Sequence, residues 1–278
     1  MTTKMLINAV DPEEFRVAFT KDGMLDGFHI ETITAEQRVG NIYKAVVERV
    51  EPSLQSCFVN FGVEKNGFLP AGDIHPEYFQ GDAAEGKAVP PVEKVIRKGQ
   101  ELLIQVTKEM PGRKGAHLTT YISIAGRYIV LTPGRTINGV SRKIEDEEER
   151  RRLKEIMSQM TLPEEIGYIV RTVAVGQNKR ELSKDLNRLL RMWRDIKKRV
   201  ARAPSFSLLH KEQDLCLRTL RDYFNSDVSE VLVDDKETYE KIREYMKIIS
   251  PLHQRRVKLY KHTVPIFDRY EIEEQIES

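Results

Sequence analysis

The chain has 278 residues, with 45 Lys and Arg against 43 Asp and Glu, and its formal net charge is +2. With 40% hydrophobic and 32% charged residues it has the composition of a globular protein, and its length suits two domains, or one domain with insertions. No uncharged apolar run reaches the length of a membrane span, about 18 residues, and the first residues lack the apolar core of a signal peptide, so we expect a cytoplasmic protein.

The first segment, residues 1–37, predicts a β-hairpin. Phe15, Val17 and Phe19 alternate with polar residues and share one face of a strand, and a turn follows at residues 21–23. The segment holds three basic and seven acidic residues, so it is acidic.

Residues 38–120 predict a small β-barrel. A Gly-, Ala- and Pro-rich stretch at 80–94 reads as a loop between strands. The clearest strand patterns are NIYKAVVERV, QSCFVNFG and ELLIQVTKE.

The period of two along QSCFVNFG separates its two faces. The better core face carries Cys57, Val59 and Phe61, and the outer face carries Ser56, Phe58 and Asn60.

Phe58 and Phe68 are candidates for a nucleic-acid surface. Phe68 follows a predicted turn, and aromatic rings exposed near Lys44 and Lys114 could stack on the bases of a single strand. The alternative, that either ring packs beneath a loop, stays open.

Residues 121–216 alternate strand and helix patterns and are basic. YISIAGRYIVL and GYIVRTVAVG predict strands, and residues 145–160 predict a helix with acidic residues in its first turns. A longer helix is predicted by apolar steps of four and three at Leu182, Leu186, Leu189, Trp193, Ile196 and Val200. Asn178 and Glu181 can cap its start.

The excess of positive charge in this region could mark a polyanion-binding face. Residues 121–216 hold 20 basic and 13 acidic residues, and the long helix has nine Lys or Arg between 179 and 199. Charge alone favours the other interpretation, in which these are solvated helix faces.

Beyond a break at residues 202–205, the sequence predicts an α/β pattern with helices near 212–224 and 236–249. Each helix is followed by a predicted strand, VSEVLVDD and RVKLYK respectively. This α/β segment could share a domain with the amino-terminal hairpin, and the middle of the chain would then be an insertion in that domain. Asp234 and Asp235 at a strand end could hold magnesium, but we favour capping of the helix at 236.

Other chemistries find little support. Cys57 and Cys216 form no Cys-x-x-Cys motif, so we expect reduced core thiols, and the six histidines have no zinc-ligand spacing. A phosphate-binding P-loop and a nucleophile elbow are absent from the sequence.

Four stretches, taken together and in order, resemble the amino-terminal half of the ribonuclease E/G family. They are GNIYKAVVERVEPSLQSCFVNFGVEKNGFLP, GRKGAHLTTYISIAGRYIVLTP, NGVSRKIED and IVRTVAVG. The resemblance implies an S1-type OB-fold barrel inserted in a split ribonuclease-H-like α/β domain, with an α/β 5′-sensor region. On that layout the ribonuclease-H-like parts are 1–37 and 217–278, the S1-type domain is 38–120, and the sensor is 121–216.

The resemblance also implies binding residues. The RNA-stacking aromatic residues of the family fall on Phe58 and Phe68, and its nearby RNA-contacting lysine falls on Lys114. Its pocket for a 5′ monophosphate falls on Gly126, Val130, Arg142, Arg171 and Thr172. A guanidinium fork and a hydroxyl group suit a terminal phosphate, and small residues permit close approach.

The catalytic residues that the family implies are not found in these 278 residues. Its magnesium-binding aspartate pair and its zinc-linking Cys-Pro-x-Cys motif follow the position of Ser278, so the chain alone is expected to hold no catalytic residue, metal or cofactor. Magnesium is expected for the full-length enzyme.

We therefore predict the RNA-binding, 5′-monophosphate-sensing portion of an endoribonuclease that cleaves single-stranded RNA. The full-length protein is a candidate homo-oligomer, and the polar ending EIEEQIES suggests a cut chain. The alternatives are a complete, non-catalytic single-stranded RNA-binding protein and an assembly module that uses the 182–200 helix as an interface.

Overall fold

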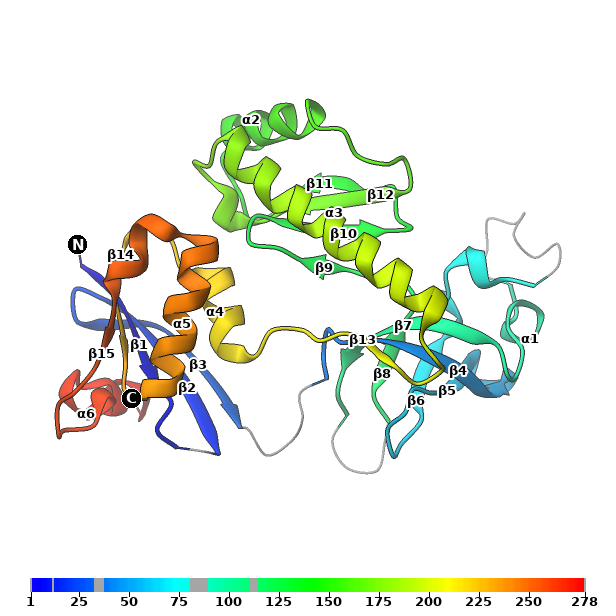
Figure 1. The fold of residues 1–278 in the computed structure, drawn as a ribbon, viewed down its shortest axis with the longest axis horizontal. Coiled ribbons are helices and arrows are strands. Elements are labelled where there is room, and N and C mark those ends of the chain that lie inside the picture. The colour runs from blue at the N-terminus through cyan, green and yellow to red at the C-terminus, as the bar shows by residue number, and fades with distance from the viewer. Residues whose placement is uncertain (1, 12, 33–37, 81–89, 111–114, 278) are drawn as a thin grey trace. The chain divides into compact units, whose positions relative to one another are not determined.

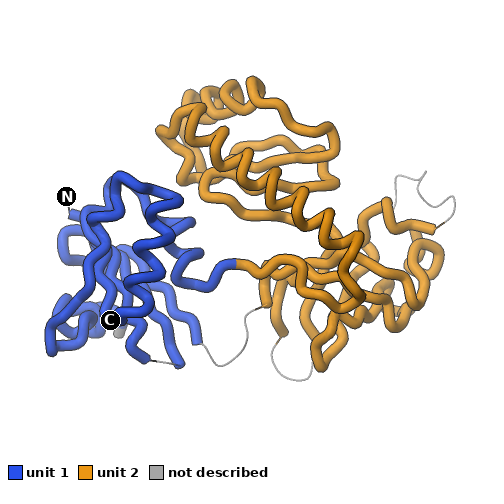
Figure 2. Tube along the Cα trace, in the orientation of Figure 1, with its two compact units in different colours: residues 1–37, 213–278 blue, residues 38–212 orange. Residues whose placement is uncertain are grey.

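A computed structural model describes the chain except for residues 1, 12, 33–37, 81–89, 111–114 and 278 (Figure 1). The chain forms two compact units. Unit 1 is residues 1–37 and 213–278, and unit 2 is residues 38–212 (Figure 2). The sequence of unit 2 is therefore inserted in that of unit 1. Among the described residues, no helix has both the length and the apolar character needed to cross a bilayer.

Unit 1 is built on a mixed five-stranded sheet in the order β15-β14-β1-β2-β3. Its strands are β1 (Thr3–Asn8), β2 (Glu14–Lys21), β3 (Met24–Thr32), β14 (Val228–Val233) and β15 (Val257–Leu259). The predicted hairpin is β2 and β3, which pair in antiparallel fashion. Strand β1 pairs parallel with β14, and this pairing joins the two separated parts of the sequence.

Helices cover both faces of this sheet. Helices α4 (Leu215–Tyr223) and α5 (Lys236–Ile249) pack on the face that carries Phe15, Val17 and Phe19. Residues of opposite phase, such as Leu6 and Ala18, pack with α6 (Ile266–Arg269) and α7 (Ile272–Glu277). Because side chains alternate along β1 and β2, the two faces of the sheet contribute to two separate cores. The acidic end of the sequence forms helix α7.

Unit 2 contains a closed five-stranded barrel. Its strands are β4 (Ile42–Glu51), β5 (Ser56–Asn60), β6 (Gly67–Pro70), β7 (Glu101–Lys108) and β8 (His117–Thr119). They follow the order β4-β5-β6-β8-β7, and the pairing of β7 with β4 closes the barrel. Cys57, Val59 and Phe61 are buried in its core, as their phase predicts.

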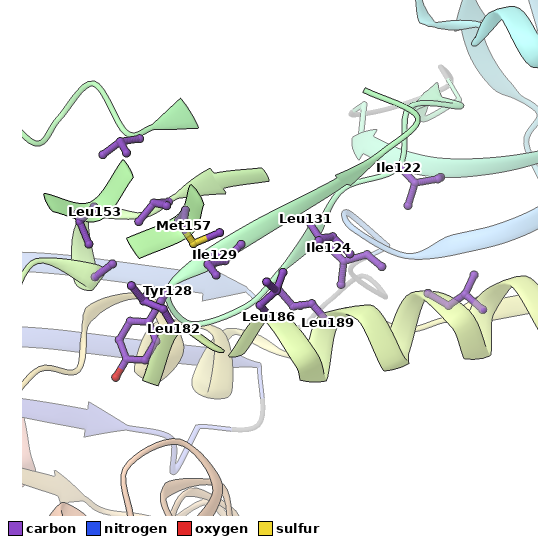
Figure 3. Close-up of a cluster of buried hydrophobic side chains, with 14 of the residues drawn as sticks. Ile122, Ile124, Tyr128, Ile129, Leu131, Leu153, Met157, Leu182, Leu186 and Leu189 are labelled. Carbon is purple, nitrogen blue, oxygen red and sulfur yellow. The ribbon is translucent and has the colours of Figure 1, made fainter. Parts of the chain in front are cut away.

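The rest of unit 2 is a four-stranded sheet packed on two helices. The sheet has the order β11-β12-β10-β9. Its strands are β9 (Ile124–Ala125), β10 (Ile129–Pro133), β11 (Asn138–Val140) and β12 (Ile166–Val170), and the helices are α2 (Glu147–Ser158) and α3 (Lys179–Arg202). Figure 3 shows Leu182, Leu186 and Leu189 of α3 against Ile129 and Leu131 of β10.

Helix α3 is also fastened to the barrel. Lys44 of β4 donates from Nζ to the carbonyl oxygen of Ala203, 3.1 Å away, directly after the helix ends. Strand β13 (Leu208–His210) then pairs antiparallel with β4. At the other end, Asn178 accepts from the Glu181 N–H at 3.1 Å, which is the predicted cap.

Several sequence predictions were wrong in detail. Ser56 is buried although its phase assigned it to the outer face, and the strand predicted by GYIVRTVAVG ends at Val170. The predicted loop at 80–94 includes the start of a short helix, α1 (Val92–Val95). Strand β13 was not predicted, because three residues carry too little periodicity to detect.

The assembly-module alternative also fails on the packing of α3. Its apolar residues Leu182, Leu186, Leu189 and Ile196 are buried inside unit 2 and are not left for a partner. The predicted fold class agrees with the structure, in which unit 2, with its closed five-stranded barrel and a further α/β region, is inserted in a split α/β domain.

Leu189→Ala should lower the free energy of unfolding of unit 2 by about 2–5 kcal/mol, because Leu189 is fully buried between α3 and the sheet. Urea unfolding followed by fluorescence measures this, since Trp193, the only tryptophan, lies on α3. Asn187→Ala, at an exposed site of the same helix, is the control. An equal midpoint shift in both variants would contradict the packing described here.

Candidate nucleic-acid interface

The outer surface of the barrel carries four neighbouring side chains, which we name the stacking row: Arg49, Phe58, Phe68 and His117. The Phe58 and Phe68 rings pack edge to face across β5 and β6, with centroids 6.0 Å apart and ring planes at 65°. His117 of β8 lies next to Phe68 at 5.2 Å. Cys57 and Val59, the neighbours of Phe58 along β5, point into the barrel core. Because side chains alternate along a strand, the Phe58 ring points outward.

Arg49 extends the row on the other side of Phe58. Its guanidinium carbon lies 5.0 Å from the Phe58 ring centroid, within the range of a cation–π contact. The Arg49 side chain is 65% exposed. A hollow of about 610 Å³ opens beside the two side chains and is also lined by Glu48, Val50, Asn66 and Lys98.

This arrangement suits a single-stranded nucleic acid. Aromatic faces accept bases of any sequence, and the neighbouring cation, Arg49, can contact a phosphate. The prediction that Phe58 and Phe68 lie together is consistent with their register in the barrel, where each is only partly buried.

The two lysines expected near these rings have different outcomes. Lys44 has a side chain only 14% exposed, and it is held by Glu101 at 3.1 Å and by the Ala203 carbonyl oxygen. It anchors α3 to the barrel, so the prediction that it rims the aromatic surface was wrong. Lys114 lies outside the described residues.

A second polar group gathers at one edge of the four-stranded sheet. We name Gly126, Arg142, Arg171 and Thr172 the edge cluster. Strands β11 and β12 are parallel, with Val140 opposite Val170, so the residues that follow both strands lie at the same edge. The Ser141 N–H donates to the Val170 carbonyl oxygen at 2.8 Å, which holds the carboxyl ends of β11 and β12 together.

One hydrogen bond joins Arg171 and Gly126 within this cluster. Arg171 donates from its guanidinium to the Gly126 carbonyl oxygen at 2.7 Å. Arg142 and Thr172 are exposed. Val130, the fifth predicted pocket residue, lies one step inside the sheet, where it pairs with Ile169 and Ala125. The structure therefore brings four of the five residues to one edge, with Val130 beside them.

Gly126 has a structural reason to be glycine. The Asp185 carboxylate of α3 accepts from the N–H groups of Arg127, Tyr128 and Ile129, at 3.2, 2.8 and 3.1 Å. A Cβ atom on Gly126 would lie 2.5 Å from Asp185 Oδ2. The small residue thus makes room for a carboxylate of the same chain.

The same contact limits how an anion could bind here. Three successive N–H groups can form an anion-binding nest, but Asp185 already occupies these three. A phosphate at this edge would therefore depend on the side chains of Arg142, Arg171 and Thr172.

The two adjacent aspartates, Asp234 and Asp235, both form hydrogen bonds within the chain. Asp234 accepts from Asn8 Nδ2 at 2.6 Å and from the Ala9 N–H at 2.8 Å, and Asp235 caps α5 through the Thr238 N–H. Burial raises the pKa of the Asp234 carboxyl. No cluster of three or more His, Cys, Asp or Glu occurs among the residues that the structure describes. The capping interpretation of Asp235 is confirmed.

The cysteines are core residues, as expected. Cys57 and Cys216 are both free and buried. Burial raises the pKa of the Cys57 thiol to about 12 and also raises that of Cys216. Because only the thiolate is nucleophilic, neither is a candidate for covalent chemistry.

Sequence reasoning missed Arg49, His117 and Asp185. Arg49 faces Phe58 because of a bulge in β4 between Val47 and Arg49, which period-two reasoning does not reveal. For Asp185 a signal existed: it is a charged residue next to Leu186 on the buried side of an otherwise apolar helix face.

Comparisons with known proteins match two successive segments of the chain to family models. Residues 123–278 match the ribonuclease E/G family, and residues 36–120 match the S1 RNA binding domain. The chain is 44% identical over 277 residues to ribonuclease E of Haemophilus influenzae, and 42% identical over 278 residues to ribonuclease E of Escherichia coli K12. It is 38% identical over 279 residues to ribonuclease G of Escherichia coli K12.

These matches cover almost all of this chain but only part of each relative. They span 99%, 99% and 100% of the chain, and 29%, 26% and 57% of the three relatives in the same order. The chain thus corresponds to less than two thirds of each of these proteins.

Asp185→Ala should lower the free energy of unfolding of unit 2 by about 3 kcal/mol or more, because each buried N–H group that loses its acceptor costs about 1–3 kcal/mol. Arg188→Ala is the control. It removes the charged partner of Asp185 at 2.9 Å but leaves the three N–H contacts, and should therefore cost less than Asp185→Ala. Urea unfolding measures both.

The same pair of sites gives a coupling test. Gly126→Ala should destabilise unit 2 less in the Asp185→Ala background than in the wild type, since its Cβ then meets no carboxylate. Equal costs in the two backgrounds would refute the steric explanation.

Proposed function

Because the chain belongs to the ribonuclease E/G family, we propose that it is the RNA-recognition part of an endoribonuclease that hydrolyses single-stranded RNA in RNA processing and decay. Its described residues would bind and orient RNA. The hydrolytic step, with the magnesium ion it is expected to need, would depend on residues of the full-length protein outside this chain.

The stacking row is the observation that carries this proposal. It lies on a barrel that matches the S1 RNA binding domain, and its neighbouring rings have centroid separations of 6.0 and 5.2 Å. Stacking recognises any base, which suits an enzyme that acts on many RNAs. A duplex has its bases already stacked and would not fit this surface, so the substrate is single-stranded.

We further propose that the edge cluster prefers RNA with a 5′ monophosphate. Arg142 and Arg171 supply guanidinium groups, and Thr172 supplies a hydroxyl group, at the ends of neighbouring strands. A terminal phosphate carries more negative charge than an internal phosphodiester and offers three oxygen atoms, so it rewards such a group of donors. This preference would make residues 121–216 the 5′-sensor region, with Val130 lining it.

The remaining parts of the proposal concern the full-length protein. The segments 1–37 and 217–278 would form its ribonuclease-H-like domain, and residues 38–120 its S1-type domain. We propose that it works in the cytoplasm, where its RNA substrates occur, and that it assembles as a homo-oligomer.

Phe58→Ala and Phe68→Ala should each weaken binding of single-stranded RNA by about 1–3 kcal/mol, the usual loss for one base stack. Fluorescence anisotropy at fixed salt measures the dissociation constant, and circular dichroism confirms folding. Phe206→Ala, which removes an exposed ring outside the stacking row, is the control. Unchanged affinity in folded Phe58 and Phe68 variants would remove the barrel surface from the proposal.

Arg142→Ala, Arg171→Ala and Thr172→Val should each reduce the affinity ratio between 5′-monophosphate and 5′-hydroxyl RNA, because only the first ligand offers the terminal charge. A charged hydrogen bond contributes about 1.5–3 kcal/mol, so the two arginine variants should lower the ratio roughly 10- to 100-fold.

Two features make this test specific. Arg171 also holds the Gly126 carbonyl oxygen, whereas Arg142 and Thr172 are exposed, so loss of preference in the latter two does not reflect misfolding. Arg151→Ala, at an exposed site on α2, controls for net charge. A wild-type chain with equal affinity for both RNAs would rule out the edge cluster as a 5′ sensor.

A further inference from the structure

The outward face of α3 carries a straight line of positive charge. With 3.6 residues per turn, Arg180, Lys184, Arg191, Arg194, Lys198 and Arg202 fall within about 40° of a single line along the helix. All six are exposed. This line, which we name the basic stripe, lies opposite the leucines that pack on the sheet, and it is about 33 Å long at 1.5 Å per residue.

The basic stripe is not neutralised by its own helix. Lys184 pairs with Glu181 at 2.8 Å, but the other five side chains form no ion pair with any residue that the structure describes. Asp195 is the one acidic residue near the line. Helix α2 differs, because Arg150 and Arg152 pair there with Glu147 and Glu149.

This arrangement is unfavourable for an isolated helix. Arg194 and Lys198, and then Lys198 and Arg202, are spaced by four residues, so like charges repel across successive turns. A polyanion laid along the stripe would remove that repulsion. The charges are therefore better explained by a ligand than by helix stability.

The helix holds these charges in fixed positions. Asp185 fastens its first half to the loop at 127–129, and Arg199 donates to the Leu209 carbonyl oxygen at 3.2 Å near its end. Ser205, just beyond the helix, bonds Glu101 of the barrel at 2.6 Å. A row of cations on a rigid support loses less entropy on binding than one on a free helix.

We propose that the basic stripe is a second RNA-contact surface, which binds the phosphate backbone of the single-stranded RNA held by the barrel. It reads charge and not sequence, and it rests on the proposed RNA-binding function.

The composition of the face argues for RNA over other polyanions. A protein partner would be expected to find aromatic or apolar anchors, and the six residues of the stripe include none. A membrane-surface helix buries its apolar face in lipid, but the apolar face of α3 is already inside unit 2. The same unit contains the match to the S1 RNA binding domain.

The test is the salt dependence of binding by the whole chain. Each phosphate contact on a single strand contributes about 0.7 to the slope of log K against log salt. The triple variant Arg191→Gln, Arg194→Gln, Lys198→Gln should therefore lower that slope by about 2. The probe is an unstructured oligouridine with a 5′ hydroxyl, so that the edge cluster does not contribute. Glutamine keeps the helix propensity of these positions.

A matched control separates position from net charge. The triple variant Lys236→Gln, Arg255→Gln, Lys261→Gln removes the same charge from exposed sites of unit 1 and should leave the slope near the wild-type value. Equal slopes for the two triple variants would overturn the proposal. So would unchanged RNA binding together with lost attachment to phosphatidylserine vesicles, because the partner would then be a membrane.

The outcome is separable from that of the barrel. If Phe58→Ala and Phe68→Ala weaken binding while the stripe variant keeps the wild-type slope, the stripe is wrong and the barrel surface stands. If the stripe variant lowers the slope of log K against log salt while Phe58→Ala and Phe68→Ala keep the wild-type affinity, the barrel surface is wrong and the stripe stands.

Discussion

The Asp185 carboxylate is the contact on which the second half of unit 2 depends. A charged group that is only 6% exposed would be costly, but three N–H groups and Arg188 compensate it. Through these bonds α3 fixes the loop that carries Gly126, and that loop in turn accepts the Arg171 guanidinium. One buried carboxylate thus helps to position Gly126 and Arg171 of the edge cluster, and it joins the leucines of α3 in holding the helix whose opposite side carries the basic stripe.

Periodicity made much of this architecture predictable. The steps of four and three at Leu182, Leu186 and Leu189 gave α3 its buried side, and the period of two at Cys57 and Val59 gave β5 its core face. These patterns are reliable because burial of one face of a helix or strand requires apolar residues at regular spacing. The joining of the two chain ends could be suggested from their α/β pattern, but the pairing of β1 with β14 is a contact between distant segments that no local pattern encodes.

The predictions that failed did so because they depend on contacts between distant segments of the chain. Lys44 sits on a barrel strand, where charge alone suggested an RNA surface, yet its partners Glu101 and Ala203 are about 57 and 159 residues away along the chain. Arg49 reaches Phe58 only because a bulge shifts the register of β4. Glycine at 126 looked like room for a ligand, and the structure gives that room to Asp185. In each case a distant segment decides what a residue touches.

The proposed contacts divide by their physics. Stacking on Phe58 and Phe68 is short-ranged and little affected by salt, whereas phosphate contacts along α3 are weakened by it. A chain that uses both would capture RNA by charge at low salt and retain it by stacking as salt rises. Neither contact reads sequence, so any selectivity among single-stranded RNAs would have to come from the edge cluster, which recognises the chemistry of an end. Three surfaces of unit 2 would then act separately: the basic stripe would attract RNA, the stacking row would hold it, and the edge cluster would select among substrates.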